Sequence, residues 1–201
     1  MTSSSATERP SHRETLLREG LNQLFDHGYH GFTVDGLLDA TGVPKGSFYH
    51  HFGSKQAFAV AILQRYWFFH QARLAKWAAR ENLSTSEVLV GYFRDIAQLF
   101  IDSGYRMTDL AGKLATEVSG ADNPLHAQIS RDVAEWRAQL EQILQAGQSR
   151  GDVRADRAAS ELSAAIHALL DGAFVVAAST RDTGFLDNLA VALRALLVGP
   201  E

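Results

Sequence analysis

The chain has 201 residues, of which 46% are hydrophobic and 21% are charged, a balance typical of a globular protein. It contains no cysteine, so disulfides, zinc fingers and catalysis by a thiol are excluded. The formal net charge of −4 at pH 7 gives the chain no general electrostatic attraction to nucleic acid.

The first thirty residues predict a polar tail followed by a helix. Residues 1–10 are rich in Ser and Thr and lack the hydrophobic core of a signal peptide, so we expect a disordered tail and a cytoplasmic protein. A capping box that begins at Ser11 opens a helix over 11–27, which the glycines at 28 and 31 would end. Phe32 would then pack beneath a small helical domain. The few prolines and the many Ala and Leu residues favour an all-α fold.

The next stretch, residues 33–55, predicts two short helices joined by a tight turn. Thr33 is a good N-cap for the first of them, which has one apolar face. Gly42 supplies a residue that can take a positive φ in the turn. Pro44 stands where a proline can open a helix, because its missing N–H costs nothing in the first turn.

The second of these helices, residues 45–51, is only about two turns long by its pitch. Phe48 and Phe52 are its large apolar anchors, and most of its other side chains are hydrogen-bond donors. Such a helix is better suited to presenting side chains than to filling a core. This is the design of a helix-turn-helix recognition helix, which docks in the major groove of DNA.

The run GFTVDGLLDATGVPKGSFYHHFGSKQAFAVAIL closely resembles the N-terminal DNA-binding domain of TetR-family transcriptional regulators. The resemblance covers about residues 15–63 without gaps. It implies a three-helix DNA-binding domain over 11–54, a larger helical effector-binding and dimerisation domain over 55–201, and a double-stranded DNA operator as partner. The residues expected to contact DNA are Thr33, Lys45, Gly46, Ser47, Tyr49, His50, His51 and Lys55.

Some of these roles have alternatives. The hydroxyl of Thr33 can be a plain N-cap, although the free N–H groups beside it can also bind a phosphate. One of His50 and His51 can simply be an exposed surface residue. Through Lys55 the chain has five Lys or Arg residues against six Asp or Glu residues, which is a net charge of −1 with neutral histidines. DNA binding would therefore depend on a few well-placed donors, on helix N-termini and on dimer avidity.

Six further helices are predicted after Gly53. The first would be about 37 Å long at 1.5 Å per residue, enough to bridge two domains, and a clear loop lies at 120–124. The expected helices span residues 55–80, 84–102, 109–117, 125–150, 156–180 and 184–198.

The helix at 156–180 differs in kind from the others. From residue 162 to 180 its only titratable side chains are His167 and Asp171. A membrane span is one interpretation of so apolar a run, but a buried Asp and His would be expensive in lipid. We favour an interface and no membrane contact: the last two helices of each subunit would form the four-helix bundle of a homodimer.

The resemblance also implies a pocket for a small-molecule effector. A buried His in an apolar helix needs a partner, which Asp171, one turn along, could supply. The segment TDLAGKLATEVSG resembles the branch of the family that contains electrophile-responsive repressors, but without cysteine only a reversible, non-covalent ligand remains. The candidate ligand-binding residues are Trp67, His70, Phe93, Phe100, Trp136, His167 and Phe174. The alternative is that these aromatic residues, which recur at helical spacing, belong to the hydrophobic core and not to a pocket.

An enzyme is the competing class of function. The chain has no HExxH, GxSxG, P-loop or GxGxxG motif in a suitable context, so we expect no catalysis, no cofactor and no metal. A third interpretation is a helical ligand-binding or scaffold protein that has lost DNA binding, consistent with the acidic N-terminal segment. The presence of Lys45, Tyr49 and Lys55 favours a repressor that a ligand releases from a pseudo-palindromic operator.

Overall fold

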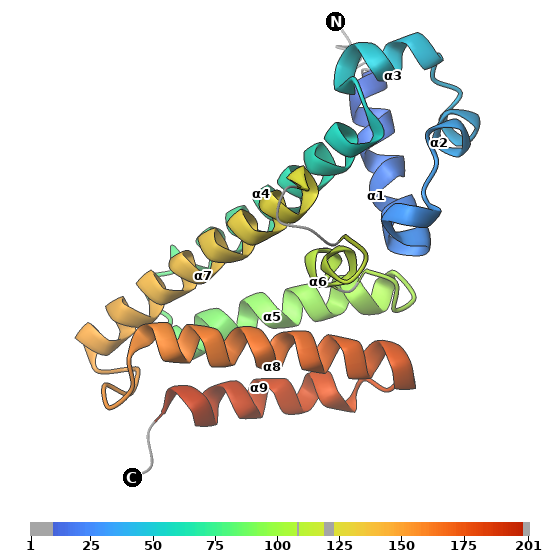
Figure 1. The fold of residues 1–201 in the computed structure, drawn as a ribbon. Coiled ribbons are helices and arrows are strands. Elements are labelled where there is room, and N and C mark those ends of the chain that lie inside the picture. Colours follow the sequence, from blue (N-terminus) through green and yellow to red (C-terminus); the bar gives the residue numbers. More distant parts are fainter. Residues whose placement is uncertain (1–9, 108, 119–122, 199–201) are drawn as a thin grey trace, which may run out of the picture.

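The computed structural model describes residues 10–107, 109–118 and 123–198, and over these residues the fold is all-α, as predicted. Helices α1 to α3 gather at one end, and α4 runs from them to the far end with α7 along its length (Figure 1). Below this pair, α5, α8 and α9 complete the larger part. The helices of the described residues are α1 (His12–Gly31), α2 (Val34–Thr41), α3 (Lys45–Phe52), α4 (Lys55–Ala78), α5 (Thr85–Asp102), α6 (Leu110–Ala115), α7 (Pro124–Arg150), α8 (Ala159–Thr180) and α9 (Gly184–Leu197).

Side-chain caps fix where the first helices begin. The hydroxyl of Ser11 accepts a hydrogen bond from the Glu14 amide at 3.2 Å, and that of Thr33 accepts one from the Gly36 amide at 3.1 Å. Such caps satisfy amides that a helix start leaves without a partner. Gly42 closes α2 in the left-handed region with φ of 66°, which sets the turn into α3.

Helix α1 breaks where the sequence predicted its end, after residue 27, because Gly28 has non-helical angles with φ of 68° and ψ of −175°. One further turn follows this kink and extends α1 to Gly31. A Cβ on Gly28 would lie 1.9 Å from a carboxylate oxygen of Glu117, so glycine is required on two grounds. The turn beyond the kink is held from outside α1, because the His30 amide donates to Glu117 Oε2 at 3.0 Å.

The small helical bundle has an aromatic core. Phe32 and Phe48 are fully buried, and their ring centroids lie 5.7 and 5.1 Å from that of Phe58 in the first turn of α4. The ring of Phe52 lies 4.7 Å from the same residue. Phe32 thus packs where the sequence predicted it. Because Phe58 belongs to α4, the long helix is rigidly joined to the recognition helix.

The larger part is tied together across its helix ends. α4 has 24 residues, which corresponds to about 36 Å. Near its C-terminus the Trp77 indole N–H donates to Asp95 of α5 at 2.9 Å. At the start of α5, the amide and hydroxyl of Thr85 donate to the two oxygens of Asp152 at 2.9 and 3.0 Å. α5 also begins with the predicted capping box of Ser84 and Glu87.

Two helices are shorter than predicted. α6 spans six residues, and α8 starts at Ala159 and not at residue 156. Residues 151–158 instead form turns, in which Arg154 pairs with Asp156 at 2.6 Å. The predicted tail at 1–10 and the loop at 120–124 fall mostly outside the described residues. Among the described helices, α8 is the one long and apolar enough for a membrane span, and it packs against α7 and α9.

Candidate DNA interface and ligand cavity

Helix α3 presents the side chains that the sequence assigned to DNA. Phe48 anchors the helix in the core, whereas Tyr49, His50 and His51 are exposed on its outer surface. Tyr49 is 45% exposed although it is aromatic. A short helix held by one face and studded with donors on the other has the geometry of a recognition element.

The other donors of this surface are partly engaged. The ammonium of Lys45 lies 3.0 Å from Asp35 Oδ1, in an ion pair that is exposed on both sides. The imidazole Nδ1 of His12 lies 3.1 Å from the hydroxyl of Ser47. The Thr33 hydroxyl is used as a cap, but the residue itself stays exposed. Asp35 therefore competes with any anionic partner of Lys45.

Lys55 lies at the back of this surface. Its ammonium sits 4.8 Å from the ring centroid of Tyr29 and 5.5 Å from that of Phe32. Partial burial lowers the pKa of Lys55, and the negative charge of Glu117 opposes that shift. This side chain therefore links the start of α4 to the end of α1, and a phosphate would have to draw it outward.

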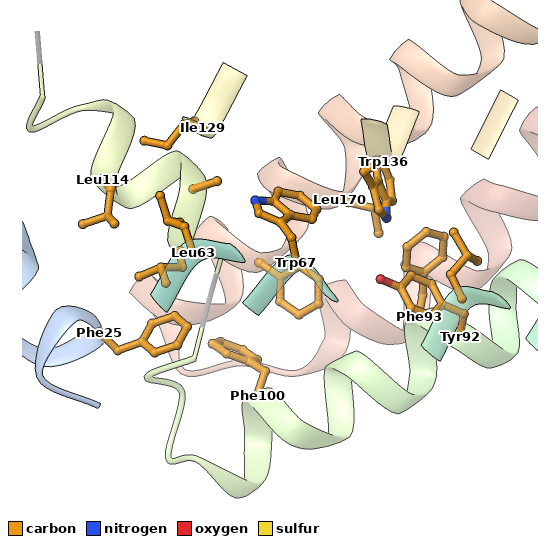
Figure 2. Close-up of a cluster of buried hydrophobic side chains, with 14 of the residues drawn as sticks. Phe25, Leu63, Trp67, Tyr92, Phe93, Phe100, Leu114, Ile129, Trp136 and Leu170 are labelled. Atoms are coloured by element: carbon orange, nitrogen blue, oxygen red, sulfur yellow. The ribbon is translucent and has the colours of Figure 1, made fainter. Parts of the chain in front are cut away.

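The larger part contains a partly open cavity of ≈ 60 Å³ between α4, α5, α7 and α8. Figure 2 shows Trp67, Tyr92, Phe93, Trp136 and Leu170 converging from these four helices. All but one of the candidate ligand-binding residues line it. The lining residues are Tyr66, Trp67, His70, Tyr92, Phe93, Ile96, Asp109, Trp136, His167, Leu170, Asp171 and Phe174.

Phe100 is the exception. It is fully buried, and its ring packs edge-on against Phe174 with centroids 5.4 Å apart. Phe100 follows Phe93 by seven residues on the same face of α5, which carries it about 10 Å along the helix and beyond the cavity. Helical spacing therefore placed Phe100 on the face of α5 that carries Phe93, but it did not show how far along the helix the cavity extends.

Hydrogen bonds order the polar groups of the cavity. The Nδ1 atom of His70 lies 3.1 Å from the Tyr92 hydroxyl. Burial lowers the pKa of His70 to about 4, with a smaller contribution from Arg73, so this imidazole is neutral at pH 7. His167 Nε2 lies 3.4 Å from Asp171 Oδ2, the pairing that the sequence suggested.

Asp109 was missed, and it connects the cavity to α6. Its carboxylate accepts the amides of Ala111 and Gly112 as the N-cap of the helix. Burial raises the pKa of Asp109, and the nearby charge of Asp171 raises it further. The sequence predicted that a helix begins at residue 109, but nothing in the sequence placed this carboxyl group in the cavity.

The opposite end of α6 holds α1. Lys113 donates to the backbone carbonyl of Phe25, and the backbone carbonyl of Glu117 lies 3.0 Å from Nε2 of His30. Just before α6, Arg106 donates to both carboxylate oxygens of Asp26 at 2.8 Å. One short segment thus joins the cavity to the helix that supports the recognition element.

Comparison with known proteins identifies the family. The profile of bacterial regulatory proteins of the tetR family matches residues 16–62, and that of the tetracyclin repressor-like C-terminal domain matches residues 110–193. The chain belongs to the TetR family.

Relatives of this TetR-family protein are similar over nearly their whole length. The HTH-type transcriptional repressor DhaR of Mycobacterium sp. strain GP1 is 28% identical, with 94% of each chain covered. The HTH-type transcriptional repressor NemR of Escherichia coli K12 is 27% identical over the same share of both chains. The crystal structure of a regulatory protein TetR from Rhodobacter sphaeroides has a TM-score of 0.84 and 26% identity, and covers 92% of this chain and 97% of that one.

These relatives are transcriptional regulators and not enzymes. The chain is accordingly a DNA-binding transcriptional regulator with a helix-turn-helix domain. The roles of individual residues in DNA or ligand contact stay predictions.

Proposed function

We propose that this TetR-family protein is a homodimeric repressor that leaves a pseudo-palindromic operator when a small molecule enters the cavity. The observation that carries the proposal is the double attachment of α6. Asp109 at its N-terminus lines the cavity, whereas Lys113 and Glu117 at its other end hold α1. A ligand that favours another position of Asp109 would move α6, and with it the small bundle that carries α3.

The size of the response follows from linkage. A ligand lowers DNA affinity only by the ratio of its own affinities for the DNA-binding and the non-binding arrangement. Because interfaces and packed cores switch between discrete arrangements, a small displacement of α6 can suffice. α1 packs against α2 and α3, so a displacement of α1 by α6 would reach the recognition helix.

At the operator, we propose that α3 enters the major groove. Lys45 would exchange Asp35 for a phosphate or a guanine edge, and Ser47 would do the same with His12. Tyr49 would contact a phosphate, and His50 and His51 would contact bases or backbone. Gly46 would permit close approach, because a Cβ there meets nothing within 4 Å. Thr33 at the start of α2 and Lys55 at the start of α4 would bind phosphates.

The dimer would form through α8 and α9. Val175, Phe185 and Val191 on these helices are 64%, 43% and 65% exposed, although each is large and apolar. A groove of ≈ 260 Å³ runs between the two helices, and beside it a Cβ on Gly172 would meet nothing within 4 Å. A second copy of this surface would bury it as a four-helix bundle. We place the DNA-binding domain at 11–54 and the effector and dimerisation domain at 55–201, in a cytoplasmic protein.

Selection of bound sites from a random DNA library tests the proposal. We expect a pseudo-palindrome whose half-sites lie about 34–36 Å apart, or a multiple of that helical repeat. Val191→Glu should give a monomer in light scattering and lose the palindrome, whereas Val34→Glu on the small bundle should leave the dimer intact. Enrichment of no sequence by a well-folded dimer would favour the alternative, a ligand-binding or scaffold protein without DNA function.

A further inference from the structure

The cavity is lined by acidic and aromatic groups. Its acidic side chains are Asp109 and Asp171, and among the described residues no Lys or Arg lines it. Arg73 is the nearby cation, but its Nε lies 3.4 Å from Asp95 and its guanidinium 5.2 Å from the ring centroid of Phe69. The cavity therefore holds two carboxyl groups without a Lys or Arg partner among the described residues.

A negative charge on one of these carboxyl groups disfavours a negative charge on the other. Asp109 accepts two backbone amides, which supply partial positive charge but no full cation. His167 Nε2 lies 3.4 Å from Asp171 Oδ2, and burial raises the pKa of Asp171 while His167 opposes that shift. Mutual repulsion and burial both disfavour the two anions. A cation placed in the cavity would remove this cost.

The aromatic walls of the cavity also suit a cation. Trp67 and Trp136, the aromatic type that binds cations best, come from α4 and α7, and further rings come from α4, α5 and α8. Tyr92 and His70 are engaged with each other, so the polar atoms left for a ligand are the carboxyl oxygens of the two Asp residues and the Trp67 indole N–H, which has no hydrogen-bond partner among the described residues. Tight-fitting rings around negative charge form a site that favours an ammonium over a neutral or anionic molecule.

We propose that the effector is a small organic cation, an ammonium compound whose charge is met by Asp109 and Asp171 and whose alkyl part contacts the aromatic rings. This inference rests on the proposed function, which makes the cavity the effector site. The volume of ≈ 60 Å³ is well below the roughly 150 Å³ of a cavity that binds benzene. By that ratio a ligand has about two or three non-hydrogen atoms in this arrangement of the helices.

Isothermal titration calorimetry of the full chain with three molecules of similar small size tests the proposal. The probes are ethylammonium, its neutral isostere ethanol and the anion acetate. We expect the ammonium to bind at least about tenfold more tightly than the alcohol, equivalent to about 1.4 kcal/mol, and the anion not to bind. Asp109→Asn and Asp171→Asn should each weaken ammonium binding about tenfold.

These substitutions are matched to their purpose. Asn caps helices about as well as Asp does, so Asp109→Asn keeps the start of α6 intact. Asp132→Asn is the control, because Asp132 is a buried carboxylate on α7 that does not line the cavity. It should leave ammonium binding unchanged.

Equal or tighter binding of the alcohol or the anion would overturn the proposal, and so would the absence of ammonium binding. The readout needs no DNA. Operator binding without ammonium binding would reject the cation and keep the repressor. Ammonium binding by a protein that prefers no DNA sequence would keep the cation site and reject the repressor.

Discussion

Asp132 should make the folded protein less stable above pH 6 than below it. The residue is only 5% exposed, its Oδ1 accepts from Gln128 at 2.7 Å, and its Oδ2 has no hydrogen-bond partner among the described residues. Burial raises the pKa of Asp132 from 3.8 to about 6. The folded protein thus holds this proton more tightly than the unfolded chain. Stability should fall as the pH rises from about 4 to about 6, and the full penalty is present above that range.

The magnitude follows from the pKa difference. At about 1.4 kcal/mol per pKa unit, the rise from 3.8 to about 6 corresponds to about 3 kcal/mol as an upper limit. Asn in place of Asp132 removes the charge but leaves an amide N–H to be satisfied, which costs about 1–2 kcal/mol. We expect Asp132→Asn to raise the free energy of unfolding by about 1–2 kcal/mol at pH 8 and not at pH 4.

Urea unfolding at both pH values checks this, with the protein concentration held fixed because a dimer unfolds in a concentration-dependent way. The difference in free energy of unfolding between the two proteins at each pH isolates the contribution of Asp132, since the other carboxyl groups, among them Asp109 and Asp171, are the same in both. An equal stability difference at pH 4 and pH 8 would refute the reasoning.

Four further substitutions have defined outcomes. Phe48→Ala should cost about 3–5 kcal/mol of stability in thermal unfolding and abolish DNA binding, because it empties the core of the small bundle; a loss below 1 kcal/mol would contradict that core. Asp35→Asn should leave stability nearly unchanged, since the pair with Lys45 is exposed. It should raise operator affinity about fivefold, about 1 kcal/mol, in fluorescence anisotropy, and unchanged affinity would show that Lys45 does not reach DNA. Gly28→Ala should destabilise the protein by at least about 1–2 kcal/mol, and Glu117→Ala should relieve the clash but not the strained φ.

Features set by local chemistry could be predicted from the sequence. The caps at Ser11, Thr33, Ser54 and Ser84 all accept the amides that the capping rules assign to them, because a cap and its amide lie within three residues of each other. Gly42 takes the predicted positive φ for the same local reason.

Features set by distant residues could not. The last turn of α1 depends on Glu117, a residue 87 positions beyond His30. For the cavity, helical spacing identified the aromatic faces of α4, α5, α7 and α8, but not where the helices cross. The candidate Phe100 does not line the cavity, whereas six residues that were not candidates do: Tyr66, Tyr92, Ile96, Asp109, Leu170 and Asp171.

The candidate DNA interface could be predicted only in part. Local pattern indicated a short helix whose exposed side holds Tyr49, His50 and His51. The pairing of Lys45 with Asp35 across the turn depends on the angle between α2 and α3, which no spacing rule supplies.

The most direct test of the central claim is a salt series of binding to the DNA that flanks this protein's own coding region, against random DNA of equal length. The account predicts tight binding that prefers the flanking DNA and falls only modestly with salt. The small bundle carries few cations, so few counterions are released. Equal affinity for both DNAs at every salt concentration, from a dimer that is folded and free of ligand, would contradict it.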